Sequence, residues 1–229
     1  MLLQGIPVHV VMDGSSRPMD VLRNQRTIAR PVSVQGIGYW SGREVCVEFR
    51  PAEVETGVVF VRRDLPGWPR IKASIDNYVA TPRRTTLRSG DATVEMVEHI
   101  LAALTGLRID NCEIWVDAPE MPGCDGSAWP FVEALNAAGL AGQGVARARR
   151  IVRETIRCGD HESWIEVRPP TKRGTFLQYG LDFGPVGPIG RQSFELWLTP
   201  ESFCSELAPS RTFLLQELSL IHILRAHET

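Results

Sequence analysis

The sequence lacks most features that mark a secreted, membrane-spanning or nucleic-acid-binding protein. Its 25 basic and 27 acidic residues give a net charge of −2, so no excess of positive charge favours nucleic acid as a partner. No apolar run reaches the roughly 20 residues that a membrane-spanning helix needs. The five cysteines form no CxxC pair, and their odd number argues against a disulfide framework. We therefore expect a reducing, cytoplasmic compartment.

The start of the chain is a poor match to a signal peptide, because it has no positively charged region and no small-residue cleavage site. We leave residues 1–24 unassigned as a leader. A stretch rich in Gly and Ala and then in Arg, at 137–149, is typical of a domain boundary. We therefore predict a first domain at 25–145 and a second at 146–217.

Several segments of the first domain have the period of β-strands. Apolar and polar residues alternate over 28–34 and 45–49, which predicts two half-buried strands joined by a glycine-rich turn. The apolar segment 57–63 and the alternating segment 112–116 predict further strands. The turn sequence GIGYWSG could also cradle a phosphate. It opens no helix and lacks the Lys-Ser/Thr pair of a phosphate loop, so a hairpin is favoured.

A helix is predicted to start at a Thr93 cap, because apolar residues recur at helical spacing up to Leu104. It carries the adjacent pair Glu98–His99. Consecutive residues diverge by about 100° around a helix, so the two do not line one face. At a helix end they could still bracket a metal, one as ligand and one as general base. Taken alone, the pair is explained more simply as a solvated Glu and a His bonded to a backbone carbonyl.

The second domain consists of strand-like segments separated by Pro and Gly, at 150–157, 164–167, 175–181 and 193–198. Strands and helices together predict an α+β fold of two similar layered units, each a sheet with packed helices. The second unit is expected to be incomplete.

The stretch VEHILAALTGLRIDNCEIWVDAPEMPGCDGSAWPFVEAL closely resembles the signature segment of UDP-3-O-acyl-N-acetylglucosamine deacetylases, the zinc enzymes of lipid A synthesis. QGIGYWSGREVCVEFRPA, TGVVFVRRDL and PSRTF flank it in the family's order, so the resemblance covers about 25–217. It implies zinc-dependent hydrolysis of the acetamide of a UDP-linked, acylated amino sugar. The enzyme is expected to be cytoplasmic, with at most peripheral contact to the inner membrane.

The same resemblance implies roles for individual residues. His99 is expected to be a zinc ligand, and Glu98 the general base that takes a proton from the attacking water. Thr212 of the PSRTF stretch is expected to donate a hydrogen bond to the oxyanion. The DGS turn at 125–127 is expected to be structural, with Asp125 forming an Asx-turn and Ser127 capping the next helix. Glu120 is expected to brace a loop.

The sequence departs from the family in several places. Tyr39–Trp40 stands where many relatives have an aliphatic residue and a His, and Cys124 replaces an apolar residue before the DGS turn. These changes predict different contacts at the mouth of the site. No Asp follows Asp182, so the H-K-x-x-D helix that completes the family's metal site is not expected here, nor is the general-acid His.

The last segment, 218–229 (LSLIHILRAHET), reads like a translated sequencing adapter, and we assign no role to His222 or His227. A short amphipathic helix is the alternative. Because the H-K-x-x-D helix and the general-acid His are not expected in this chain, the fragment is expected to be inactive. Two rival functions remain open: a non-catalytic nucleotide-binding module, and a zinc amidohydrolase that acts on another substrate.

Overall fold

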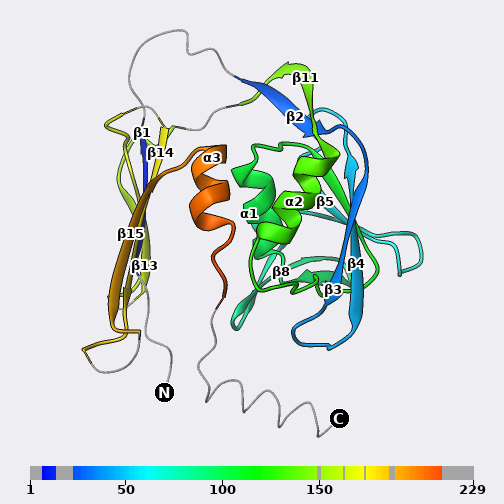
Figure 1. Cartoon of the computed structure of the whole chain (residues 1–229), viewed down its shortest axis with the longest axis horizontal. Helices are drawn as coiled ribbons and strands as arrows, with labels where there is room; N and C mark the ends of the chain where they lie inside the picture. Colours follow the sequence, from blue (N-terminus) through cyan, green and yellow to red (C-terminus); the bar gives the residue numbers. More distant parts are fainter. Residues whose placement is uncertain are drawn as a thin grey trace, which may run out of the picture. The chain divides into compact units, whose positions relative to one another are not determined.

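The computed structural model describes residues 7–13, 23–148, 151–161, 163–172, 174–185 and 189–212. Contacts within the chain divide it into two compact units (Figure 1). One unit runs over 26–141 and resumes at 206; the other holds 142–205 together with residues up to 25. Within the described ranges, no helix is both long and apolar enough to cross a bilayer.

The main sheet of the unit at 26–141 has five strands, in the order β3-β4-β10-β5-β6. Their bounds are β3 (Val32–Ile37), β4 (Glu44–Pro51), β10 (Cys112–Val116), β5 (Val58–Arg62) and β6 (Arg70–Lys72). The central strand β10 is antiparallel to β4 and parallel to β5. β3 and β4 form the predicted hairpin, and the predicted strands at 57–63 and 112–116 are confirmed.

Two helices cover the apolar face of this sheet. α1 (Glu98–Gly106) and α2 (Trp129–Ala138) contact each other, and α2 also contacts β3 (Figure 1). The ring of Phe131 on α2 meets that of Phe49 on β4 edge to face, with centroids 6.3 Å apart. Both rings are fully buried, as are Ile100 and Leu104 on α1. Removal of this apolar surface from water is the main term that stabilises the unit.

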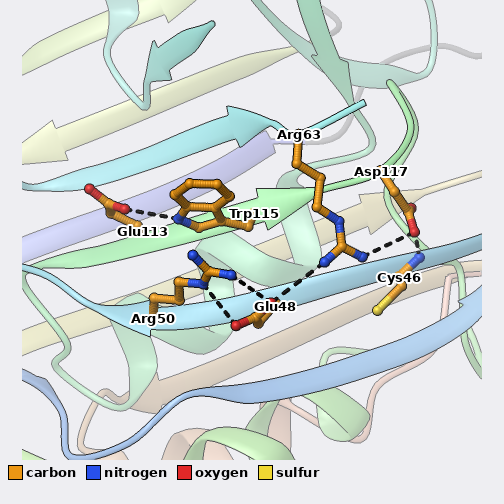
Figure 2. Close-up of polar contacts among 7 residues, drawn as sticks. All are labelled: Cys46, Glu48, Arg50, Arg63, Glu113, Trp115 and Asp117. Atoms are coloured by element: carbon orange, nitrogen blue, oxygen red, sulfur yellow. Dashed lines mark hydrogen bonds and ion pairs between the residues drawn. The ribbon is translucent and has the colours of Figure 1, made fainter. Parts of the chain in front are cut away.

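The other face of the sheet is polar, because side chains alternate across each strand. Figure 2 shows Glu48 between two guanidinium groups: it accepts hydrogen bonds from Arg50 at 2.8 Å and 3.1 Å and pairs with Arg63 at 3.5 Å. Arg63 also pairs with Asp117, and the Arg50 guanidinium lies 4.0 Å from the centre of the Trp115 ring. The face opposite the apolar residues of β10 thus carries charged groups and the Trp115 ring.

The predicted start of α1 is wrong. Thr93 lies in β9 (Ala92–Glu95), which pairs with β8 (Arg84–Ser89), itself paired with β7 (Tyr78–Thr81). Met96 then takes a left-handed backbone conformation, with φ of 59°, and the helix starts only at Glu98. Strand pairing therefore overrides the helical spacing that predicted a helix start at Thr93. Glu98 gains the first helical position, where the positive end of the helix dipole favours a carboxylate.

The unit at 142–205 contains a second five-stranded sheet, in the order β12-β13-β1-β14-β15. Its strands are β12 (Ile156–Gly159), β13 (Trp164–Arg168), β1 (Pro7–Asp13), β14 (Gly174–Asp182) and β15 (Arg191–Trp197). The segment left unassigned at 1–24 thus supplies β1, which runs parallel to β13 and antiparallel to β14. The strand predicted at 150–157 starts only at Ile156.

The remaining elements are short. β2 (Asn24–Ile28) pairs with β11 (Leu140–Ala146). η1 (Ile75–Asn77) precedes β7, and α3 (Pro200–Ser202) continues into η2 (Phe203–Leu207). Mixed sheets with few helices confirm the α+β class.

Candidate active site

Glu98 stands at the start of α1 with its two carboxylate oxygens in different environments. Oε1 accepts a hydrogen bond from the backbone N–H of Thr85, at 3.1 Å. Oε2 is buried and has no hydrogen-bond partner in the described part of the chain. One oxygen is therefore fixed by the β8 backbone, while the other keeps its capacity to accept a proton or hydrogen bond. A buried polar atom without a partner is rare enough to suggest a functional role.

His99 follows at the next position and is half-buried. Burial lowers the pKa of its imidazole, and the nearby carboxylates of Glu98 and Asp125 oppose this shift in part. The net shift favours the neutral ring. Neutral imidazole is the form that ligates metals.

Thr212 approaches this pair from a distant part of the sequence. Its side-chain oxygen lies 3.4 Å from Nε2 of His99. Its backbone N–H donates to the carbonyl of Gly126 at 2.8 Å, and Arg211 pairs with Asp125 at 3.5 Å. The 211–212 segment is thus docked on the DGS turn. The structure thus places Thr212 against His99, the neighbour of Glu98.

The DGS turn itself is held by short-range hydrogen bonds. Asp125 Oδ1 accepts from the backbone N–H of Ser127 at 3.0 Å and from its hydroxyl at 2.7 Å. The side-chain bond from Ser127 is the largest cause of the lowered pKa of Asp125. The Asx-turn is confirmed. The predicted helix cap is displaced by one residue: Ala128 is the N-cap, and the Ser127 hydroxyl accepts from the Trp129 N–H at 3.1 Å.

Glu120 braces the loop between β3 and β4, as predicted. Its carboxylate accepts from the backbone N–H groups of Trp40 at 2.6 Å and Ser41 at 2.8 Å. The residue is only 4% exposed, so water cannot readily replace these bonds. The Trp40 indole contacts the sulfur of Met96, two positions before Glu98. The aromatic pair that departs from the family pattern is therefore next to the site.

Sequence reasoning missed two contributions to this site. The Thr85 N–H and the Gly126 carbonyl are backbone groups, so the residue types at these positions do not predict their contacts. Only the pairing of β8 with β9 and the shape of the DGS turn bring them into place.

Among the residues that the structure describes, the donor set for a metal is only partly present. A catalytic zinc ion usually takes three protein ligands and leaves one position open. Across the described ranges, no three His, Cys, Asp or Glu side chains are grouped closely enough to hold a metal ion. In that part of the chain, the neutral imidazole of His99 fits one ligand position, and Oε2 of Glu98, which has no partner there, fits a proton acceptor. His222, His227 and the segment 218–229 lie outside the described residues.

Comparison with known proteins identifies the family of the chain. The family model described as LpxC, UDP-3-O-acyl N-acetylglycosamine deacetylase, matches residues 25–227. The chain belongs to this deacetylase family. The match extends beyond Glu217, and the adapter interpretation of 218–229 stays a prediction.

Individual relatives of the deacetylase family agree with this assignment. The chain is 41% identical to the UDP-3-O-acyl-N-acetylglucosamine deacetylase of Bdellovibrio bacteriovorus over 82% of its length and 62% of the relative's. It is 39% identical to the bifunctional enzyme LpxC/FabZ of Chlorobaculum tepidum, over 84% and 41% of the two chains. A deacetylase of Oleidesulfovibrio alaskensis is 37% identical over 87% and 65%. The chain thus spans 41% to 65% of the length of these three relatives.

Proposed function

We propose that this chain takes part in hydrolysing the acetamide of UDP-3-O-acyl-N-acetylglucosamine, in lipid A biosynthesis and with zinc as cofactor. Family membership and the names of the relatives support the reaction class and the substrate. One observation carries the proposal to the residues: the Thr212 hydroxyl lies 3.4 Å from His99 Nε2, and the residue before His99, Glu98, has a buried carboxylate oxygen with no hydrogen-bond partner among the described residues.

In this proposal each residue has one task. His99 would hold zinc through its neutral imidazole, and bound zinc would polarise the acetamide carbonyl and make water more acidic. Glu98 takes the proton from the attacking water at Oε2, while the Thr85 N–H keeps the carboxylate oriented through Oε1. Thr212 donates its hydroxyl proton in a hydrogen bond to the oxygen that becomes negative.

The single imidazole found among the described residues leads to a second proposal. One imidazole binds zinc far more weakly than three protein ligands do, so the 229-residue polypeptide is expected to hydrolyse the substrate weakly or not at all. Robust, zinc-dependent acetate release by this polypeptide alone would contradict that expectation.

Setting and architecture are proposed on the same basis. The enzyme is proposed to be cytoplasmic, as expected for its family. It is proposed to contact the inner membrane peripherally, because its substrate carries an acyl chain. We also propose that the two units share one layered design, and the division at 25–145 and 146–217 stays a prediction.

A chimera tests the reaction. Residues 25–212 would replace the aligned part of the Bdellovibrio bacteriovorus relative, and acetate release from UDP-3-O-acyl-N-acetylglucosamine would be measured with and without zinc. We expect a zinc-dependent activity that Glu98→Gln lowers by about 10²- to 10⁴-fold, the usual contribution of a general base. Glu133→Gln, on the exposed side of α2, is the matched control and is expected to change little. Full activity of the Glu98→Gln chimera would refute the proposed role.

The two rival functions give different results in the same system. A nucleotide-binding module would bind UDP equally well without metal and with Glu98→Gln. A zinc amidohydrolase of another substrate would keep the metal dependence but show no preference for the UDP-linked, 3-O-acylated sugar. Titration calorimetry of the chimera with UDP and with the acylated substrate separates them.

A further inference from the structure

Tyr39 lies in the loop that joins β3 to β4, and this loop is fixed on both sides of it. The Gly38 N–H donates to the carbonyl of Arg43 at 2.9 Å, closing the base of the loop. The Glu120 carboxylate holds the backbone N–H groups of Trp40 and Ser41. The backbone that carries the Tyr39 ring is therefore tied to a buried carboxylate, although 48% of the residue's surface is exposed.

The Tyr39 ring lies across the turn at 123–126. A Cβ added to Gly123 would be 2.4 Å from Cδ2 of Tyr39, and one added to Gly126 would be 2.9 Å from its hydroxyl oxygen. Both contacts are closer than real Cβ atoms approach, so the ring fits only because these two residues are glycines. Gly126 also has φ of 85°, a conformation that favours glycine. The ring thus fills the space that the missing side chains leave.

The same turn docks the segment that carries Thr212. The Gly126 carbonyl accepts from the Thr212 N–H at 2.8 Å. The position of a Gly126 Cβ would be 3.9 Å from the Thr212 carbonyl oxygen and 4.0 Å from Cβ of Arg211. Tyr39, the turn and the 211–212 segment are therefore three contacting layers. The last of them reaches His99 through the Thr212 hydroxyl.

We propose that Tyr39 is a positioning residue whose ring holds the 123–126 turn in the shape that seats Thr212 against His99. A turn with two glycines has wide backbone freedom, and a ring packed across both of them removes it. The contacts of Thr212 with the turn and with His99, here called the Thr212 seat, are a property of the fold. Their importance for catalysis rests on the proposed function of Thr212.

Amide hydrogen exchange of the 229-residue chain tests the seat. The Thr212 N–H is protected by its bond to Gly126, so Tyr39→Ala is expected to speed its exchange roughly fivefold or more, the scale of one lost hydrogen bond. Tyr39→Phe keeps the ring and is expected to restore protection. Trp40→Ala, the neighbouring aromatic, is the matched control and is expected to leave the Thr212 rate unchanged. The buried amide of Val94 in β9 reports on whether the unit stays folded.

Two results would overturn the inference: a Thr212 rate that Tyr39→Ala leaves unchanged, or a rate that Tyr39→Phe raises as much as Tyr39→Ala does. If Tyr39→Ala also speeds exchange of the Val94 amide, Tyr39→Leu, which keeps apolar bulk, replaces it. The ratio of the Thr212 rate to the Val94 rate is then compared with that of the wild type: a raised ratio supports the inference, and an unchanged ratio overturns it. This readout does not require catalysis. If the Thr212 amide is protected normally in a chimera that has no deacetylase activity, the proposed function is refuted and the inference about Tyr39 is not.

Discussion

The side-chain oxygen of Thr212 lies 3.4 Å from Nε2 of His99, across 113 positions of sequence. The two residues are not held by neighbours in the chain. They meet because the turn at 123–126 accepts the Thr212 backbone, while α1 presents His99 from its first turn. A change in the turn should therefore reach the site without altering any residue that touches substrate.

Gly126→Ala is expected to destabilise the protein more than Gly90→Ala. Both glycines have positive φ, so both substitutions carry a left-handed penalty of roughly 1–2 kcal/mol. Only at Gly126 would the new Cβ also meet Tyr39; around Gly90 the space is open. We expect an excess of about 1–3 kcal/mol from this overpacking, measured by urea unfolding.

A double-mutant cycle gives the control for that comparison. In a Tyr39→Ala background the excess of Gly126→Ala over Gly90→Ala should largely vanish. An excess that persists without the ring would show that the Tyr39 contact is not its cause.

Glu120→Ala is expected to destabilise the unit by about 2–4 kcal/mol, because two backbone N–H groups lose a buried, charged acceptor. Glu120→Gln keeps one oxygen acceptor and should fall between wild type and Glu120→Ala. Denaturant unfolding measures all three proteins. Equal stability of the Ala and Gln variants would mean that the bonds to Trp40 and Ser41 are not what stabilises the loop.

Acid should weaken the protein partly through Glu48. The hydrogen bond from Arg50 is the largest cause that lowers the pKa of Glu48 below its ordinary value of 4.5 (Figure 2). A depressed folded-state pKa contributes stability that is present above the ordinary value and is lost as pH falls through the folded value. Glu48→Gln removes this proton-linked contribution, so its unfolding free energy should fall less steeply below about pH 5. Parallel pH profiles for the two proteins would contradict this assignment.

The cysteines should differ strongly in reactivity. Burial raises the pKa of the Cys112 thiol to about 12, so almost no thiolate forms in the folded protein. Cys158 is exposed. With a thiol-specific disulfide reagent at pH 8, Cys158 should react at once and Cys112 only after unfolding. Peptide mapping identifies the labelled residues, and Cys158→Ser should remove the fast phase; rapid labelling of Cys112 in the native chain would oppose the prediction.

Much of the fold was readable because its elements follow simple periods. The segment 112–116 alternates without interruption and is a strand with the predicted bounds, whose alternate residues are buried. The predicted helix start at Thr93 is wrong because local spacing does not show that this segment pairs with β8. Likewise, no local pattern shows that β1 joins strands encoded far later in the chain.

The site was readable only in part, for a related reason. The Glu98–His99 pair is local and could be found as a pattern. The place of Thr212 beside His99 depends on long-range docking, and only family resemblance suggested it. The proposed role of Tyr39 depends on the packing of its ring across Gly123 and Gly126. Composition and spacing do not predict that packing.

The order of strands also constrains how the polypeptide can fold as it is synthesised. β10 lies between β4 and β5, yet it is made after both of them. A nascent chain that has emerged only as far as β9 can pair β3 with β4 and β5 with β6, but it lacks the strand that joins the two pairs. Synthesis at about 5–20 residues per second leaves these edges open for on the order of a few seconds. The arrival of 112–116 at the ribosome exit is therefore the event that lets this sheet close.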